Sequence, residues 1–352
     1  VTYAGNITTN GNLIVVGPSY FFGNITEVGN LVITGKAINN GPSVFNGAMI
    51  VTGDTTMVGN VVQSGNLTIT GTTVNNGLSV FNGNIAMTGN AVISGNTAIT
   101  GNTLVTGNTR VVGATYLTGN SYVTGNTFVT GTTTVAGNTY VTGQVTTITG
   151  NTYLTGNSFV TGTTTVTAGR LNLAGSLAIS TLALQSGSSL GASGTVGSLA
   201  RSALTLHSGS SLGGNGTVGS LTAQSGSTVS PGNSIGTLAV NGNLTLTAGS
   251  TLAIEVAPSG SDMVTVTGTA NLAGNLNIAP SAGQYSFFQR FTLLSANTVT
   301  GTFANSSVGD FGPKFLPKLI YDATSVVLRL DPKSLVDVSG GTLRGNALAF
   351  AT

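Results

Sequence analysis

The stretch GNTRVVGATYLTGNSYVTGNTFVTGTTTVAGNTYVTG, residues 107–143, places glycine at every sixth position. The same phase holds without a miss from Gly5 to Gly143, and it slips by one residue at Gly150 and again at Gly169. A six-residue period is too short for a helical repeat and too regular for a loop, and it is typical of short strands joined by corners and stacked coil upon coil. The sequence therefore predicts an all-β fold, a parallel β-helix or solenoid.

The six positions of the repeat have distinct roles when glycine is numbered 0. Positions 2 and 4 carry aliphatic and small residues, and they are predicted to point inward because residues two apart on a strand share a face. Positions 3 and 5 are predicted to point outward, and position 3 accepts large side chains such as Tyr116, Tyr122, Phe128, Tyr140 and Arg110. Gly-Asn at positions 0 and 1 suits a corner, since both residues reach positive φ at low cost. Three hexads then make one triangular coil, and coils stacked about 4.8 Å apart pair their backbone amides.

A longer echo supports whole coils. A pattern that contains Asn-Asn-Gly at 39–41 and Ser-Val-Phe-Asn-Gly at 43–47 returns at 75–77 and 79–83, which is an offset of two coils. Asn39 and Asn75 occupy inward position 4, so we expect them to form a short internal amide ladder. Phe45 and Phe81 are expected to stack in the same way.

Two kinds of solenoid fit the hexads. The pattern is similar to that of left-handed β-helices, and the Thr-Gly-Asn-Thr runs also suit the three-chain intertwined β-helices of viral fibres. Both arrangements leave the same inward pattern, so handedness and the number of chains stay open at this point.

Charge is sparse. Charged residues make up 5% of the 352 residues, the net charge is +2, and residues 55–254 contain no acid. The C-terminal part has a mild basic bias that comes from Lys314, Lys318, Arg329, Lys333 and Arg344. We interpret these residues as scattered edge charges that discourage strand pairing. No nucleic-acid partner is predicted, because nucleic-acid binding needs a clustered basic face.

The chain contains no cysteine and no tryptophan. The absence of cysteine is consistent with an exported bacterial protein and excludes a disulfide framework. No apolar run of about 18 residues is present, so no transmembrane helix is predicted. The repeat begins directly at Val1, so any signal peptide is expected to have been removed or excluded.

Beyond Gly169 the period lengthens. Ser-Gly-Ser-Ser-Leu-Gly at 186–191 returns at 208–213, an offset longer than three hexads. The chain continues with SGSTVSPGNSIGTLAVNGNLTLTAGSTLAIEV at 225–256 and SDMVTVTGTANLAGNLNIAP at 261–280. These segments resemble the passenger-associated transport repeat of bacterial type V autotransporters, and the residues that follow resemble the C-terminal folding or junction segment of that family. The resemblance covers about residues 185–331, and it implies a right-handed β-helix that is exported across the outer membrane and folds outside the cell from its C-terminal end.

Four segments are predicted: a hexapeptide-repeat β-helix at 1–168, a transport-repeat β-helix at 169–280, a junction or folding segment at 281–331, and a tail at 332–352. In the second segment, inward alternation is expected for Leu238, Val240, Leu244 and Leu246. The junction segment is expected to have a denser core that nucleates the remaining coils, supplied by Tyr285, Phe287, Phe288, Phe291 and Phe303.

No catalytic residue, cofactor or metal site is predicted. Glu27 and Asp54 are the acids of the hexad region, and nothing in the sequence pairs them across a groove as in a glycosidase. Calcium-binding repeats need Asp in each coil, and Asp is missing there. His207 has no acid nearby in sequence for a catalytic triad and is expected to face solvent. Runs such as Thr132–Thr134 hint at the threonine ladders of ice-binding proteins, but the outer positions mix threonine with aromatic, aliphatic and basic residues.

The function expected from these features is structural. We expect an autotransporter-like rod at the bacterial cell surface that is a filament subunit or an adhesin, with a second copy or a host or abiotic surface as its partner. Filaments would form by end-to-end strand pairing. The structural turn motif is expected at Ser230, Pro231, Gly232, Asn233 and Ser234. The expected assembly tail consists of Gly340, Leu343, Ala347, Leu348 and Phe350. A trimeric viral fibre is the alternative, and an enzyme acting on polysaccharides is a remote one.

Overall fold

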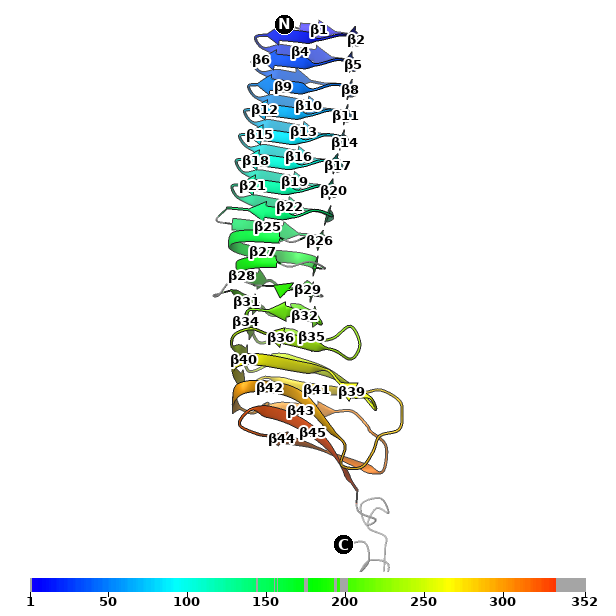
Figure 1. Ribbon diagram of the computed structural model, residues 1–352, viewed down its shortest axis with the longest axis vertical. Coiled ribbons are helices and arrows are strands. Elements are labelled where there is room, and N and C mark those ends of the chain that lie inside the picture. Colours follow the sequence, from blue (N-terminus) through cyan, green and yellow to red (C-terminus); the bar gives the residue numbers. More distant parts are fainter. Residues whose placement is uncertain are drawn as a thin grey trace, which may run out of the picture. The chain divides into compact units, whose positions relative to one another are not determined.

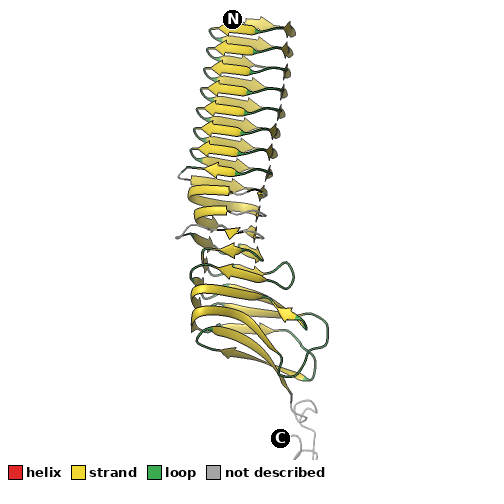
Figure 2. Ribbon diagram, in the orientation of Figure 1, coloured by secondary structure: helices red, strands yellow, loops and turns green. Residues whose placement is uncertain are grey.

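The computed structural model describes residues 2–143, 145–154, 156, 158–173, 177–192, 195–196 and 202–333. Within these ranges every regular element is a strand and no helix occurs (Figure 2). The described residues accordingly include no helix that is long and apolar enough to cross a membrane. The chain divides into two compact units, unit 1 (Val1–Ala183) and unit 2 (Leu184–Thr352). The all-β solenoid prediction is confirmed.

Unit 1 is a stack of parallel triangular coils that a single chain closes by itself (Figure 1). Each strand pairs in parallel with the strand three elements further on, as Leu67 does with Ile85 and Thr103 with Ser121. Partners in register are thus separated by three hexads. Three faces result, and each keeps its own column of strands along the stack. The predicted coil of three hexads is confirmed.

The strands of unit 1 fall on three faces. Face 1 consists of β1 (Thr2–Ala4), β4 (Ser19–Phe22), β7 (Ala37–Asn39), β10 (Thr55–Val58), β13 (Thr73–Asn76), β16 (Ala91–Ser94), β19 (Thr109–Val112), β22 (Thr127–Thr130) and β25 (Val145–Thr149). Face 2 consists of β2 (Ile7–Asn10), β5 (Ile25–Val28), β8 (Ser43–Phe45), β11 (Val61–Gln63), β14 (Ser79–Phe81), β17 (Thr97–Thr100), β20 (Thr115–Thr118), β23 (Thr133–Val135) and β26 (Thr152–Leu154). Face 3 consists of β3 (Leu13–Val16), β6 (Leu31–Thr34), β9 (Met49–Thr52), β12 (Leu67–Thr70), β15 (Ile85–Thr88), β18 (Thr103–Thr106), β21 (Ser121–Thr124) and β24 (Thr139–Val141). The long strand β27 (Ser158–Leu173) pairs with the last strand of each face, and β28 (Leu177–Leu184) follows it.

Inward and outward positions follow the hexad. Leu67 and Ile69, at positions 2 and 4, are buried, while Tyr122, at position 3, is 41% exposed. This alternation is the one expected for a strand with one face on a core. The predicted inward and outward pattern is therefore confirmed.

Glycine is required at the corners for two reasons. Gly71 has a φ of 139°, a conformation that side chains with a Cβ rarely adopt. A Cβ on Gly71 would also lie 2.4 Å from the carbonyl oxygen of Gly53 in the preceding coil. Successive corners thus approach too closely for any side chain, which explains why the glycine phase is kept from Gly5 to Gly143.

Asparagine at position 1 has a different role from the one predicted. Among the described residues, Phe288 is the only non-glycine residue with positive φ, so the corner asparagines do not share the conformation of the glycines. Their side chains instead bond to the next coil: the backbone N–H groups of Asn84, Asn102 and Asn120 donate to the Oδ1 atoms of Asn66, Asn84 and Asn102 at 3.1, 2.9 and 3.0 Å. The side chains therefore form a ladder on the outside of the stack.

The expected internal ladders are wrong. Met57 lies in register between Asn39 and Asn75, so the two amides do not meet. Asn75 instead donates from Nδ2 to the Oγ of Ser79 at 2.5 Å, and Asn39 bonds in the same way to the serine that follows it in its own coil. Phe45 and Phe81 are likewise separated, by Gln63, because an offset of two coils always leaves one coil between the copies.

The slip in the glycine phase is absorbed locally. Thr127 pairs with Thr146 and Thr133 with Thr152, so these coils are one residue longer than three hexads. A bulge between Ile148 and Thr149 takes up the second slip. One extra residue per coil is thus accommodated at an irregularity without changing which side chains face inward.

Unit 2 contains coils of unequal length. Leu190 pairs with Leu212, as the predicted repeat requires. Leu212 pairs with Val229 in a shorter coil, and Val264 pairs with Leu294 in a longer one. Its strands are β29 (Ser188–Ala192), β30 (Thr195–Val196), β31 (Ala203–Leu206), β32 (Ser211–Gly214), β33 (Thr217–Val218), β34 (Ser220–Ala223), β35 (Thr228–Pro231), β36 (Thr237–Val240), β37 (Leu244–Leu246), β38 (Thr251–Ala257), β39 (Gly260–Ser261), β40 (Met263–Leu272), β41 (Asn275–Pro280), β42 (Arg290–Gly301), β43 (Asn305–Val308), β44 (Phe315–Tyr321) and β45 (Ser325–Pro332).

The core of unit 2 is leucine-rich and ends in an antiparallel cap. The predicted inward set is confirmed as fully buried: Leu238, Val240, Leu244 and Leu246. Beyond the last parallel coil, β45 pairs antiparallel with both β42 and β44. Phe291 and Phe303 are buried beneath this cap, but Phe287 and Phe288 are 50% and 63% exposed. The expectation that all the aromatic residues of this segment join the core is therefore wrong for these two.

Candidate functional site

The predicted turn motif lies where β35 leaves the core. Ser230 and Pro231 end the strand, and Gly232 has a φ of 84°. The N–H of Gly232 donates to the carbonyl oxygen of Gly214 at 3.0 Å, and the N–H of Gly214 donates back at 3.1 Å. Asn233 and Ser234 are exposed. The motif thus closes a turn by backbone bonds to the preceding coil.

A buried carboxyl group holds this turn in place. Asp262 is fully buried, and its Oδ1 accepts from the N–H of Gly236 and its Oδ2 from the N–H of Glu255, both at 2.8 Å. Burial raises the pKa of Asp262 above its ordinary value, while the two backbone bonds oppose that rise. A Cβ on Gly232 would lie 2.7 Å from Asp262 Oδ1. Sequence reasoning missed Asp262 because it lies far along the chain from the motif.

The Gly-Ser corners of unit 2, which include the two Ser-Gly-Ser-Ser repeats, share a recurring hydrogen bond. The buried hydroxyls of Ser210 and Ser227 each donate to a carbonyl oxygen earlier in the same corner, at 2.6 Å. Ser188 and Ser250 do the same at 2.6 and 2.7 Å. Every one of these corners therefore satisfies its own buried polar group, as a stable interior requires.

His207 occupies one such corner and has no acid partner. It is half-buried, and its Nδ1 lies 2.8 Å from Oε1 of Gln224 in the next coil. The expectation that His207 faces solvent is thus only partly met. The contact is between side chains that occupy equivalent corner positions, and it links neighbouring coils.

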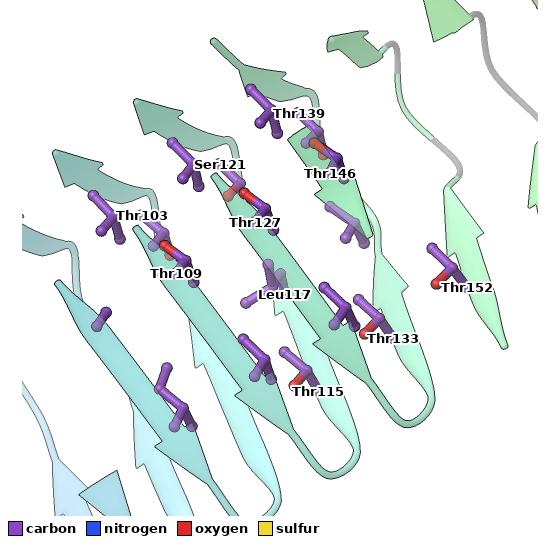
Figure 3. A pocket seen from close by; sticks show the side chains of 18 of the residues that line it. Thr103, Thr109, Thr115, Leu117, Ser121, Thr127, Thr133, Thr139, Thr146 and Thr152 are labelled. Atoms are coloured by element: carbon purple, nitrogen blue, oxygen red, sulfur yellow. The ribbon is translucent and has the colours of Figure 1, made fainter. Parts of the chain in front are cut away.

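The axis of unit 1 contains a cavity of 160 Å³, close to the roughly 150 Å³ of an engineered cavity that stays dry and binds benzene or xenon. Figure 3 shows threonines of successive coils projecting into this space from facing strands. The cavity exists because valine and threonine replace leucine and isoleucine at the inward positions, and Val123 and Thr127 are typical of its lining. Its wall is almost entirely carbon.

The inward threonines of unit 1 bury hydroxyls that have no hydrogen-bond partner. Each such group costs about 1–3 kcal/mol when it is left unpaired. The group comprises Thr55, Thr73, Thr97, Thr103, Thr109, Thr115, Thr127, Thr133, Thr139, Thr146, Thr152 and Thr164. The core of unit 1 is thus filled sparingly and with polar groups left unmatched.

The acids of unit 1 are not gathered into a site. Glu27 points inward and is fully buried, and neither carboxyl oxygen has a partner. Asp54 takes the place of asparagine at a corner, where its Oδ1 accepts from the N–H of Thr72 at 2.9 Å. Among the described residues no group of three or more His, Cys, Asp or Glu side chains could hold a metal ion.

Face 3 has the most regular outer surface of unit 1. Its position-5 column is an unbroken run of threonines in register, all exposed: Thr34, Thr52, Thr70, Thr88, Thr106 and Thr124. The adjacent column contains Ile50, Leu104 and Tyr122, and none of the strands of this face, from Leu13 to Val141, carries a charged residue. The mixture of outer residues seen along the sequence therefore resolves into distinct columns, one face at a time.

Two tyrosines on face 3 are stacked on each other. The rings of Tyr122 and Tyr140 lie 4.8 Å apart and are nearly parallel. Each ring thus covers one flat side of the other, and both side chains remain exposed.

The residues of the expected assembly tail lie outside the described residues. They are Gly340, Leu343, Ala347, Leu348 and Phe350. The proposed connector role of this segment therefore stays a prediction.

No protein-family model matches this chain, and no curated protein sequence is significantly similar to it. The resemblance to the autotransporter transport repeat therefore rests on the motifs quoted above.

Proposed function

We propose that this chain is an autotransporter-like β-solenoid rod that bacteria display outside the cell and that acts as a structural adhesin. The observation that supports the proposal is the regular register of unit 1, in which coil after coil repeats the same three faces. A surface of this kind offers length and repetition, which suit many weak contacts along a partner surface.

The acids support a structural role because those with identified partners serve the fold. Asp54 bonds to a corner amide, Asp262 holds a turn, and Asp310 accepts from the N–H of Gly312. Asp322 bonds to Ser325 in the hairpin turn, and Asp331 pairs with an arginine. None of these contacts leaves a carboxylate poised over an open groove.

Face 3 is the adhesive surface that we propose. It combines exposed hydroxyls with aliphatic and aromatic groups and no charge, so it suits an uncharged polymer or an apolar surface. The double variant Tyr122→Ser/Tyr140→Ser should reduce adsorption of the full chain on polystyrene, measured with a quartz-crystal microbalance. The matched control is Tyr116→Ser/Tyr153→Ser on face 2, where both rings are exposed. If the two double variants lose the same amount of adsorption, face 3 is not a dedicated adhesive surface.

The filament form of this function depends on how the chain ends meet. The edge strand of the cap, β44, carries Pro317 and Lys318. Both residue types discourage the addition of a further strand. We therefore propose single rods, with filaments only if residues 338–352 act as the connector. Negative-stain microscopy with light scattering decides this: short particles of 34.8 kDa are expected. Long fibres that disappear on deletion of 338–352 would overturn the single-rod form.

A further inference from the structure

All lysine and arginine residues described in unit 2 lie between residues 290 and 333, while residues 202–289 contain none. These five cations are Arg290, Lys314, Lys318, Arg329 and Lys333. They belong to the antiparallel sheet of β42, β45 and β44 or to the residues at its edge.

Three of these cations form a row across the sheet. Lys318 pairs with Arg329, and Arg329 pairs with Arg290, on neighbouring antiparallel strands. Residues directly opposite each other share a face, and like charges in that position destabilise a sheet. Lys318 and Arg290 are exposed. The sheet thus tolerates a repulsive arrangement that its fold does not require.

A single carboxylate offsets the row. Arg329 donates to both carboxyl oxygens of Asp331, and the NH2 contact measures 2.7 Å. This hydrogen bond lowers the pKa of Asp331, and the positive charges of Lys318 and Arg290 add to the effect. Protection of a sheet edge explains Lys318, which lies on the edge strand β44. It does not explain Arg290 and Arg329, which lie on the inner strands β42 and β45.

Exposed apolar side chains lie at the same end of the cap. Leu316, opposite Asp331 on the outer face, is 51% exposed, and Phe287 and Phe288 are 50% and 63% exposed. The ring of Phe287 lies 5.1 Å from that of Phe315 at the start of β44. Leu316 thus lies on the same face of β44 as Lys318, whereas Phe287 contacts Phe315, whose position in the strand belongs to the other face. The cap therefore presents Leu316 beside its cation row, and Phe287 and Phe288 directly before β42 begins.

Phe288 is also held in an unfavourable backbone conformation. Its φ is 61°, which is uncommon for a bulky residue and costs about 1–3 kcal/mol. Its N–H donates to the carbonyl oxygen of Leu330 at 2.7 Å, and this bond holds the backbone of Phe288 against β45. Strain that keeps an apolar ring in water indicates a use for the ring.

We propose that the cap of unit 2 binds the surface of an anionic lipid bilayer. The cation row contacts the headgroup phosphates, and Leu316 and Phe288 enter the interface between headgroups and acyl chains. A soluble polyanion would use the cations and leave the apolar side chains in water, whereas a bilayer uses both. This binding does not depend on the adhesive role proposed for face 3.

Co-sedimentation of the full chain with vesicles tests the proposal. Binding is expected to vesicles of phosphatidylcholine with phosphatidylglycerol, to weaken as salt is raised, and to be absent with phosphatidylcholine alone. Because each basic residue near a membrane contributes about fivefold, Lys318→Gln should weaken binding about fivefold and Arg290→Gln/Lys318→Gln about 25-fold. Arg110→Gln, which removes an exposed charge from unit 1, is the matched control and should change nothing.

Phe288→Gly gives a second, independent readout. Glycine adopts positive φ without strain, so the unfolding midpoint should hold or rise while vesicle binding falls. A residue with only a structural role would not separate the two. Equal binding to neutral and anionic vesicles, binding to heparin without binding to vesicles, or an equal loss with Arg110→Gln would each overturn the proposal.

Discussion

Units 1 and 2 are both built from parallel coils, but different side chains fill their interiors. In unit 1 the corners are uniform, with glycine in close contact and asparagine bonded to the next coil, while threonine and valine occupy many of the inward positions around a 160 Å³ cavity. In unit 2 the coils vary in length, but leucines fill the core and Ser210 and Ser227 satisfy their own corners. Regularity and tight packing are therefore separate properties of a solenoid.

The difference implies a division of stability. The buried side-chain atoms without a hydrogen-bond partner in the described ranges all lie in unit 1, between Glu27 and Thr164. Nearest-neighbour contacts dominate the stability of a solenoid, so a coil with unmatched hydroxyls also weakens its neighbours. We expect unit 1 to unfold more readily than unit 2.

The largest effect should come from shortening an inward side chain in unit 2. Ile278→Ala should lower the free energy of unfolding by about 4 kcal/mol, and Ile99→Ala by about 2 kcal/mol, because Ile99 already borders the cavity whereas Ile278 is closely packed. Urea unfolding, with hydrogen exchange read separately over peptides of each unit, measures both. Equal losses would show that the interior of unit 1 is as well filled as that of unit 2.

A corner substitution should come next. Gly71→Ala combines a φ of 139° with a Cβ placed 2.4 Å from Gly53 O, and we expect a loss of about 3 kcal/mol. Gly312 is the matched control, since its φ is 105° and nothing lies within 4 Å of its added Cβ. Gly312→Ala should cost about 1 kcal/mol, from the positive φ alone. If thermal unfolding shows the same loss for both, close approach of the coils does not contribute.

Hydroxyl removal should have opposite signs in the two units. Thr127→Val removes a buried hydroxyl that has no partner, so the free energy of unfolding should rise by about 1–2 kcal/mol. Ser227→Ala removes a hydroxyl that donates to Gln224 O at 2.6 Å, so it should fall by about 1 kcal/mol. Chemical denaturation of the two variants measures the difference. A neutral Thr127→Val would indicate that water satisfies the hydroxyl.

The smallest effect concerns pH. The pKa of Asp262 is raised in the folded chain above the ordinary 3.8, chiefly by burial. Its contribution to stability is therefore fully present below pH 3.8 and is lost as the pH rises through the folded value. The pKa of Asp331 is lowered, so its contribution to stability has the opposite pH dependence. That contribution is present above pH 3.8 and is lost as the pH falls below this value. Thermal unfolding from about pH 4 upward should show a decline that Asp262→Asn abolishes, and a decline that persists in this variant would assign it elsewhere.

Much of unit 1 could be predicted from sequence because its period is local. The position of a residue within its hexad decides that Ile69 faces inward and Tyr122 outward. The coil length of three hexads decides which residues pair in the next coil. The expected contacts of Asn39 with Asn75 and of Phe45 with Phe81 were wrong because similarity at an offset of two coils is not adjacency. The corner asparagine ladder was missed because the residue type alone suits both a positive φ and a side-chain bond.

The sequence by itself determined the all-β solenoid, the coil of three hexads and the inward leucines of unit 2, because a period of six fixes strand, corner and face through neighbouring residues. Only the tertiary structure decided that Asp262 holds the turn at Gly232 and Gly236, that three cations align across the cap, and that Phe288 faces water. These contacts join residues far apart in the chain through coils of unequal length, and no period in the sequence encodes their register.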